Sequence, residues 1–311
     1  MATLKTTDVK HVREDLADVI SDISPEETPF LSMIGKTSAT GRYHEGLSDT
    51  LEAPNANNAA IEGADAPAAV QNGPARFGNY CQIFTKTVDV AGTLEASNTA
   101  GTKSELARQM TKKAKEIKRD QEAAYVSENG SVATGARKLA GAAALISTNA
   151  IHGAGGSTAG FNPATSVTGA VVAGTDEVLT EADFKEAIAK VWEQSDGALT
   201  AFANGSLKQK ISTFNGNAQM MQDASKNTVV SNVKLYESDF GIVKVLTSRY
   251  VSSKTVLLID PTLWAVATLR KYEKKELGRT GDATRFQLLT EVTLECKNEA
   301  GNGKLADRLA A

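Results

Sequence analysis

The chain contains 311 residues, of which 34 are Lys or Arg and 37 are Asp or Glu, so its formal net charge is −3. This length exceeds what one core usually organises, and we expect two domains or one domain with long extensions. The balanced charge excludes a disordered polyelectrolyte and a strongly basic nucleic-acid binder. Aromatic residues concentrate in residues 181–311, which predicts a compact core there.

Residue types that perform catalysis or bind metals are few and scattered. Cys81 and Cys296 lie too far apart in sequence for a disulfide framework or a zinc pattern, and we expect two inert thiols in a reducing compartment. His11, His44 and His152 are equally separated and are expected at the surface. No phosphate-binding loop, dinucleotide fingerprint or nucleophile elbow is present. We therefore expect no enzyme, no cofactor and no metal site.

Charge is segregated along the chain. Residues 1–70 have a net charge of −7, whereas residues 71–130 have a net charge of +2. An acidic segment followed by a basic one suggests self-association through complementary charge. No segment resembles a signal peptide or approaches the roughly 18 apolar residues of a membrane span. We expect a soluble protein that is made in a cytoplasm and does not contact membranes.

Residues 1–45 are predicted to form an acidic arm. The apolar spacing within residues 9–20 predicts a short helix, and Ser24 is placed to cap a turn that begins at Pro25. Pro29 prevents a continuous helix from there onward. An apolar plug follows and must dock on another surface; it consists of Phe30, Leu31, Met33 and Ile34.

Residues 46–75 are rich in Ala, Asn, Gly and Pro and contain few bulky side chains, which is typical of a loop. The chain then becomes β-rich. Phe84, Val88 and Val90 would share one face of a strand. A long polar loop that returns through one strand predicts a projecting two-stranded arm.

The clearest predicted helix covers residues 102–128. Thr102 and Glu105 have the spacing of a capping box, and Asn129-Gly130 is expected to end the helix. One narrow apolar stripe runs along this helix, so we expect it to lie across a surface rather than inside a core. Its polar face is basic and includes Lys103, Arg108, Lys112, Lys113, Lys115, Lys118 and Arg119.

The sequence in the middle of the chain gives weaker signals of secondary structure. Residues 136–146 fit a short helix or a strand equally well, and residues 152–160 are expected to form a loop. From residue 179 onward, helices and strands alternate. Thr180 and Asp183 form a capping box for a helix, whose expected buried stripe is Phe184, Ile188, Val191 and Trp192.

A short strand is predicted at residues 198–203, and the apolar run at 255–259 predicts a central strand. Asp260-Pro261 is expected to start a short helix through Trp264 and Leu269. A strand of about 14 residues should follow at 284–297, which is more than twice the usual length. Gly301-Asn302-Gly303 is expected to make a hairpin turn into a last short strand.

This order of parts resembles the major capsid protein of tailed bacteriophages, which has the Hong Kong 97-like fold. Local sequences support the resemblance. Residues 24–35 look like the SP–TPF–IGK start of one capsid subfamily, and Arg76, Asn79, Gln82 and Ile83 look like its R-N-QI return strand. Further similar segments are Arg137-Lys-Leu-Ala-Gly141, Asp260-Pro-x-x-Trp264, Leu269-Arg270, Gly281-Asp282 and Glu291-x-Thr-Leu-Glu295.

The resemblance implies an α+β subunit of an icosahedral shell that encloses phage double-stranded DNA. The implied parts are an N-terminal arm (1–45), an extended β loop (46–95), a peripheral domain with a long spine helix (96–178), an α/β axial domain (179–269), and the long strands of the peripheral domain (270–311). The extended loop would lie over a neighbouring subunit. The family's name-giving member crosslinks a Lys to an Asn, but neither maps here, so no covalent crosslinks are expected.

The resemblance also implies partners. The chain would form hexamers and pentamers of itself, contact a portal protein and touch packaged DNA non-specifically, after assembly in the cytoplasm of the host bacterium. No scaffolding domain of about a hundred residues precedes the arm, so separate scaffolding and decoration proteins are expected. The candidate inter-subunit contacts are Phe30, Leu31, Ile34, Arg42, Arg76, Lys112, Lys113 and Asp282.

Three alternatives to a viral shell are considered. The nearest is an encapsulin-like compartment, because encapsulins share the fold. The second is a nucleic-acid-binding or partner-binding module, which the basic helix at 102–128 would favour. The third is an enzyme with an unrecognised site, for which the sequence offers no clustered catalytic groups.

Overall fold

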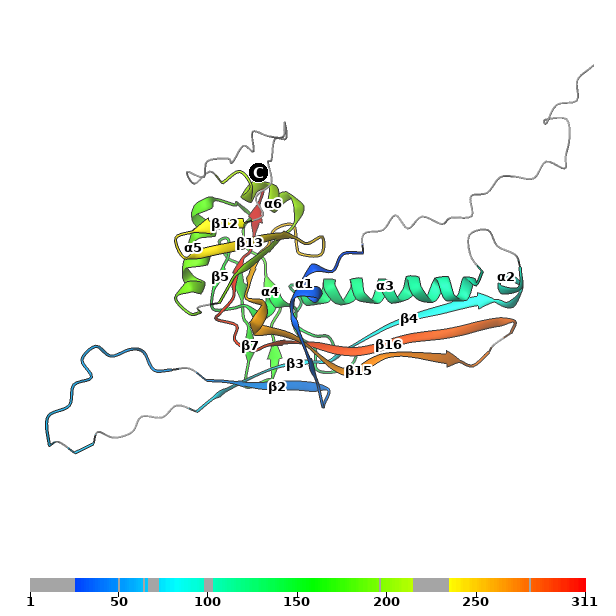
Figure 1. Cartoon of the computed structure of the whole chain (residues 1–311), viewed down its shortest axis with the longest axis horizontal. Helices are drawn as coiled ribbons and strands as arrows, with labels where there is room; N and C mark the ends of the chain where they lie inside the picture. Colours follow the sequence, from blue (N-terminus) through cyan, green and yellow to red (C-terminus); the bar gives the residue numbers. More distant parts are fainter. Residues whose placement is uncertain are drawn as a thin grey trace, which may run out of the picture.

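A computed structural model gives the fold of residues 26–49, 51–63, 65–66, 73–97, 103–195, 197–214, 235–279 and 281–311. The helix expected at 9–20 and the caps at Ser24 and Thr102 lie outside these residues. Figure 1 shows a compact body from which a long helix and several long strands extend side by side. A loop projects away from the body and from these elements. Both helices and strands contribute, as expected for an α+β chain.

Among the described residues, four strands form the extended sheet, in the order β1-β15-β16-β4. Their bounds are Gly35–Ser38 (β1), Trp264–Leu277 (β15), Ala283–Cys296 (β16) and Gln82–Ala91 (β4). β16 has the predicted 14 residues and pairs antiparallel with both β15 and β4. Phe84, Val88 and Val90 are buried on one face of β4, which confirms the predicted strand face.

The long helix α3 (Glu105–Tyr125) lies along this sheet (Figure 1). In the described part of the chain, the Ser104 hydroxyl caps this helix and accepts a hydrogen bond from the Ala107 N–H. The Glu105 carboxylate accepts hydrogen bonds from the Arg108 guanidinium within the helix. The helix ends at Tyr125, earlier than predicted, because the following residues turn into the body.

Within the described chain, the body contains a second sheet in the order β12-β13-β11-β14-β17-β5. The central strand β14 is buried along its whole length, as its apolar sequence predicts. The capping box of Thr180 and Asp183 also forms, at the start of α5. The elements of this body are β5 (Ala150–Ile151), α5 (Glu181–Trp192), β11 (Thr200–Ala203), α6 (Gly205–Ile211), β12 (Leu235–Ser238), β13 (Gly241–Thr247), β14 (Val256–Ile259) and β17 (Gly303–Leu305).

The expected helix from Asp260 through Leu269 is wrong. Only a 3₁₀ turn forms, at Pro261–Leu263, and Trp264 begins the long strand β15. The turn forms because the Asp260 carboxylate accepts a bond from the Thr262 N–H. The chain then continues as a strand because β16 offers a complete antiparallel partner.

The hairpin expected at Gly301-Asn302-Gly303 is also wrong. β17 does not fold back onto β16 but enters the sheet of the body, antiparallel to β14 and parallel to β5. The buried Asn302 directs this path, because its side-chain oxygen accepts bonds from the Trp264 indole and from the Asp260 N–H. Residues 303–305 therefore do not belong to the long strands of the expected 270–311 segment.

Short elements connect these parts. The undecided segment at 136–146 contains a helix, α4 (Ala142–Leu145), all of it buried. The expected loop at 152–160 carries β6 (Ser157–Thr158), which pairs with β9 (Val171–Val172). The remaining short elements are α2 (Gly92–Ala96), β7 (Phe161–Asn162), β8 (Val167–Thr168), β10 (Glu177–Val178) and β18 (Arg308–Leu309).

The two larger apolar clusters of the described residues hold the molecule together. One contains Trp264 and joins α3, α4 and the extended sheet to the body, and the other lies between α5, α6 and the body sheet. Trp192 is expected in the buried stripe of α5, but this expectation is wrong. Its side chain is 55% exposed and stacks on Phe240 at the surface.

Candidate inter-subunit interface

The apolar plug of the N-terminal arm forms a short helix, α1 (Pro29–Met33), with the permitted proline at its first position. The N–H groups of Phe30 and Leu31 donate hydrogen bonds of 2.8 Å to the two carboxylate oxygens of Glu122 on α3. Glu122 is fully buried. A carboxylate at a helix N-terminus satisfies N–H groups that have no partner within the helix. Glu122 thus fixes the place where the arm meets the body.

Phe30 fills the space beside this contact. Its ring lies 5.7 Å from Phe202, 6.1 Å from Trp264 and 6.5 Å from Tyr125 between centroids. Phe30 and Ile34 are both buried in the core of this chain. The plug docks, as predicted. The expectation that Phe30 and Ile34 contact another subunit is corrected, because buried side chains offer no surface to a neighbour.

Burial raises the pKa of the Glu122 carboxyl, and the two N–H donors act in the opposite direction. Glu122 is not among the residues predicted from the sequence. A signal was available, because Gln121 already interrupts the apolar stripe of α3 and Glu122 follows it directly.

Leu31 points into a groove between α1, α3 and the extended sheet, with a cavity volume of about 570 Å³. Three lysines and no acidic residue line it, and we call it the lysine groove. No described carboxylate forms an ion pair with any of the three lysines. The lining consists of Thr28, Leu31, Ser32, Lys36, Lys118, Gln121, Tyr125, Val266, Thr268, Lys271, Tyr272, Thr290 and Val292.

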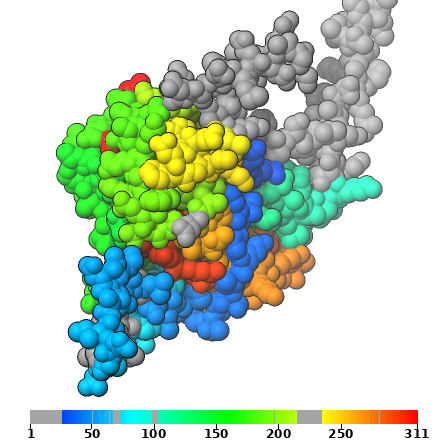
Figure 2. All heavy atoms as spheres, turned by 60° about the vertical axis from the view of Figure 1, so that its left-hand side comes forward, coloured from blue at the N-terminus to red at the C-terminus, as the bar shows by residue number. Residues whose placement is uncertain are grey.

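The predicted two-stranded arm is present, but Phe84, Val88 and Val90 lie in β4 of the extended sheet and not in the arm. β2 (Tyr43–Ser48) pairs antiparallel with β3 (Ala75–Tyr80), and residues 49–74 connect them. Figures 1 and 2 show the described part of this connection standing clear of the body. Arg42 and Arg76 are exposed at this arm, and Leu47 on β2 is also exposed.

The remaining candidates lie elsewhere. Lys112 is exposed on α3, and Lys113 forms an ion pair of 2.8 Å with Glu116 on the same helix. Asp282 is exposed at the turn between β15 and β16, where its carbonyl accepts a bond from the Gly92 N–H. The predicted contact residues are therefore spread over the length of the molecule rather than gathered in one patch.

A buried ion cluster explains three of the motif residues, Arg137, Arg270 and Glu291. Glu291 on β16 accepts a bond of 2.5 Å from Arg137 and one of 2.7 Å from Arg270. The Glu291 side chain is 4% exposed, so its charge depends on these two partners. The cluster ties the segment after α3 to the long strands.

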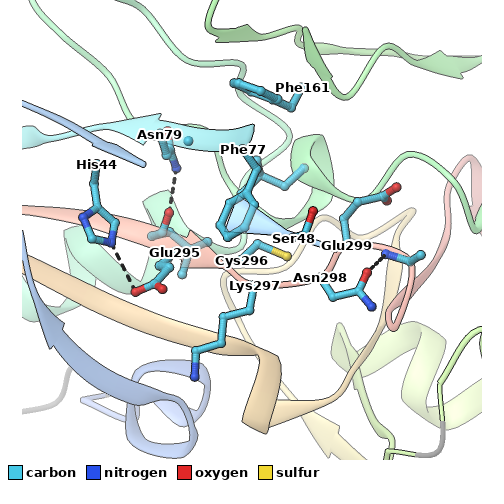
Figure 3. A pocket seen from close by; sticks show the side chains of 14 residues that line it. His44, Ser48, Phe77, Asn79, Phe161, Glu295, Cys296, Lys297, Asn298 and Glu299 are labelled. Atoms are coloured by element: carbon cyan, nitrogen blue, oxygen red, sulfur yellow. Dashed lines mark hydrogen bonds and ion pairs between the residues drawn. The ribbon is translucent and has the colours of Figure 1, made fainter. Parts of the chain in front are cut away.

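A second cavity, of about 240 Å³, lies at the base of the two-stranded arm (Figure 3). His44 points toward Glu295 at its rim, with 3.2 Å between Nε2 and the carboxylate. Cys296 lines the cavity, and burial raises the pKa of its thiol. Burial likewise raises the pKa of Cys81, to about 11, so both thiols stay protonated near neutral pH, as inert thiols would.

One histidine expectation is wrong. The His152 side chain is 9% exposed and lies 3.4 Å from the Asp307 carboxylate. Its buried position arises because Asp307 also accepts a bond from the Gly153 N–H and holds this turn against the body. Within the described residues, no group of three or more His, Cys, Asp and Glu side chains could hold a metal ion. None of the described helices is long and apolar enough to span a membrane.

Solved structures with the same fold are shell proteins. The cyanophage A-1(L) capsid subunit matches with a TM-score of 0.65 at 11% identity, covering 98% of this chain and 99% of that one. The capsid of a native GTA particle gives 0.63 at 12% identity, with 98% of each chain covered. The SrpI encapsulin of Synechococcus elongatus PCC 7942 gives 0.57 at 11% identity, covering 100% and 98%. The Hong Kong 97-like fold is thereby confirmed.

The fold is one that shell-forming subunits adopt. The sequence model of the SU10 major capsid protein family matches residues 2–308, and the chain belongs to this family. The major capsid protein of Escherichia phage Phieco32 is 26% identical over 329 residues, covering 93% of this chain and 92% of that protein. The chain is therefore a phage major capsid protein, a structural protein of the virion, and the encapsulin alternative is set aside.

Proposed function

We propose that this capsid protein assembles as pentamers and hexamers into an icosahedral shell around the double-stranded DNA genome of a tailed bacteriophage. Assembly would take place in the cytoplasm of the host bacterium. The observation that supports the proposal is the extended loop, whose Leu51 and Ile61 are 100% and 82% exposed. Large apolar side chains on a projecting loop favour burial against a partner.

The structure suggests how the expected domains divide. We assign α3 and the extended sheet to the peripheral domain, with β15 from Trp264 onward included. The six-stranded sheet with α5 and α6 would be the axial domain around the symmetry centres. β17 belongs with that axial sheet by its pairing, although it follows the long strands in sequence.

Electron microscopy of the purified protein tests the assembly. We expect closed shells or ring-shaped capsomers, and their diameter would give the number of copies. A protein that remains monomeric at all concentrations and salt conditions, also when its phage partner proteins are co-expressed, would contradict the proposal.

We further propose a portal protein, a separate scaffolding protein and decoration proteins as partners, on the basis of the family alone. Packaged DNA would be touched without sequence preference. Expression of this chain without other phage proteins tests the scaffold. Correctly closed shells from the chain alone would refute a separate scaffolding requirement, whereas aberrant or open assemblies would support it.

A further inference from the structure

The direction in which the two-stranded arm projects is not set by apolar packing. Between the base of the arm, the end of β16, α4 and β7 lies the cavity of about 240 Å³ (Figure 3). Phe77, Leu145 and Phe161 line it from three different elements but do not fill it. Atoms that face an open space lose the contacts that close packing would provide. Polar contacts at the base must therefore hold the arm at its angle.

The arm is stiff where it leaves the extended sheet. Tyr43 and Tyr80 pair across β2 and β3, with 4.7 Å between their ring centroids. The two strands approach so closely that a Cβ at Gly78 would lie 2.9 Å from the carbonyl oxygen of His44 and would also meet the Tyr43 hydroxyl. The base of the arm should therefore turn as one unit, whose direction depends on the contacts that it makes with the body.

Asn79 on β3 makes the first of these contacts, and it is buried. Its side-chain N–H groups donate to the carbonyls of Ala140 and Leu294, at 3.1 and 3.0 Å. Its side-chain oxygen accepts from the N–H groups of Ala140 and Tyr80, at 2.8 and 2.9 Å. These four bonds use the whole hydrogen-bonding capacity of an amide side chain. Asn79 thus joins the arm to β16 and to the segment after α3.

The same junction brings together three of the sequence motifs. Gln82, which follows the arm, accepts a bond of 3.2 Å from the N–H of Leu139 through its side-chain oxygen. Arg137, two residues earlier, donates to Glu291 on β16. The return strand, residues 137–141 and β16 therefore meet at the base of the arm, and most of their motif residues serve this junction.

His44 on β2 makes the second contact. Its Nε2 lies 3.2 Å from the Glu295 carboxylate on β16, and the two side chains are 18% and 15% exposed. The Glu295 carboxylate also accepts a bond of 2.9 Å from the Thr37 hydroxyl on β1. Water therefore screens this pair only in part, so protonation of the imidazole would strengthen its attraction to the carboxylate.

The other charged groups around the cavity do not compete for this pair. Lys297 is exposed, and its side chain extends away from His44 (Figure 3). The Glu299 carboxylate accepts bonds from two backbone N–H groups that follow α4. The charged side chains that alternate to the opposite faces of the neighbouring strands are Glu45 of β2, Arg76 of β3 and Lys36 of β1.

We propose that Asn79 and His44 are positioning residues that fix the direction of the arm in the free subunit, before any neighbour is bound. Asn79 is an anchor that does not titrate, and His44 adds a contact to Glu295 that strengthens on protonation. An arm that is already oriented lowers the ordering cost of association. The proposal rests on the shell function proposed above, because assembly is what the oriented arm would serve.

Spin-label distances measure the direction of the arm. Nitroxides at Leu47→Cys on β2 and Thr111→Cys on α3 occupy exposed positions, and the native Cys81 and Cys296 are buried. Dilution with unlabelled chains restricts pulsed electron paramagnetic resonance to distances within one chain. The original chain should give one narrow distance distribution. Asn79→Ala should broaden it about twofold, because the arm loses its anchor and two buried donors lose their acceptor.

The pH dependence gives a readout that a merely structural role would not move. For the original chain, the distribution should narrow as the pH is lowered from about 8 to about 5.5, the range in which histidine titrates. His44→Phe and Glu295→Gln should abolish this response. His44→Gln, which retains a hydrogen-bond donor toward Glu295, should match the original chain at the higher pH. The matched control, Asp89→Ala, removes an ion pair of 2.6 Å with Arg285 on the same sheet and should change nothing.

The orientation of the arm should also affect assembly. Variants with a broad distribution should yield fewer closed particles, by at least about threefold, because the arm must then be ordered during association. Electron microscopy of the unlabelled variants would measure this yield. A broad distribution together with a normal yield would overturn the proposed role in assembly.

The remaining outcomes separate the two proposals. An unchanged distribution in Asn79→Ala, or a pH response that survives Glu295→Gln, would overturn the positioning roles while leaving the shell function intact. If thermal unfolding shows that Asn79→Ala does not fold, the His44 and Glu295 variants give the answer, and an unaltered pH response in both would overturn the proposal. Failure of the original chain to form any shell with its partner proteins would instead refute the shell function.

Discussion

At the residue scale, Glu122 is a buried carboxylate whose partners are two backbone N–H groups rather than a cation. It holds the first turn of α1 against α3, so the free energy of this contact depends on one side chain. Replacing it would leave two buried donors without acceptors, and an unsatisfied buried donor costs more than a hydrogen bond contributes.

We predict that Glu122→Ala lowers the free energy of unfolding of the isolated subunit by about 2–4 kcal/mol. Chemical denaturation monitored by Trp fluorescence would measure this, because Trp264 lies beside Phe30. Glu116→Ala, which removes only the ion pair with Lys113, is the control and should cost less than about 1 kcal/mol. Equal effects would mean that Glu122 does not anchor the arm.

Lys304 is a second buried charge, and its ammonium donates to the Ala143 carbonyl and to Thr158. Burial lowers the pKa of Lys304 to about 8 from 10.5. Between these values the unfolded chain binds more protons than the folded one, so the contribution of this residue to stability rises with pH.

We therefore predict that the stability of Lys304→Met falls relative to that of the original chain as the pH is raised from about 7.5 to about 10, because only the original chain gains stability over this range. The relative change should be at most about 3 kcal/mol, since one pKa unit corresponds to about 1.4 kcal/mol. Urea unfolding at several pH values would measure it. A pH-independent difference between the two proteins would show that the ammonium titrates normally.

At the element scale, local signals were sufficient where a helix or strand depends on its own sequence. The capping box of α5, the long β16 and the buried β14 were all predicted from spacing and composition. Errors arose where the secondary structure of a segment depends on strands that are distant in sequence. Trp264 lies in a strand because β16 pairs with it, and residues 303–305 leave the hairpin path because β14 and β5 accept them.

The same limit applies to the candidate contacts. Apolarity marked Phe30 and Ile34 as residues that must be covered, but it could not say whether the cover is another subunit or the same chain. Asn302 was missed because a single polar residue outside a periodic segment carries no signal, although its side chain is completely buried. The exposed arm was predicted because its polar composition cannot form a core.

The basic face of α3 gives a prediction at this scale. Lys112 is exposed and Lys113 has only a surface ion pair, so reversing both to Glu should change the melting temperature of the isolated subunit little. We expect assembly, measured by light scattering, to weaken more. Lys185→Glu with Lys190→Glu on α5 is the control, since both also form helical surface pairs. Equal losses of melting temperature and assembly would show that Lys112 and Lys113 stabilise the fold of the subunit rather than the contact between subunits.

At the scale of the whole molecule, the extended loop contributes surface rather than stability. Residues 51–63 are exposed throughout, so the fold of the body does not depend on them. This separation makes the loop accessible to experiment, because a change there should affect association without affecting the subunit.

We predict that replacing residues 51–73 by a short Gly-Ser turn leaves the thermal unfolding of the subunit within a few degrees and abolishes closed shells. Differential scanning calorimetry and electron microscopy would measure the two effects. A scrambled loop of the same composition is the control for length. Normal shells from the shortened chain would show that the loop is dispensable for assembly.

The position of β17 has a consequence for the order of events during synthesis. Residues 303–305 are buried between β14 and β5, and no other described strand occupies that place. While residues 303–305 of a nascent chain are still inside the ribosome, the arm has already been synthesised. The body sheet, however, still lacks the strand between β14 and β5. The body sheet can close only after residues 303–305 emerge, so a chain that still lacks them is unsuited to join a growing particle.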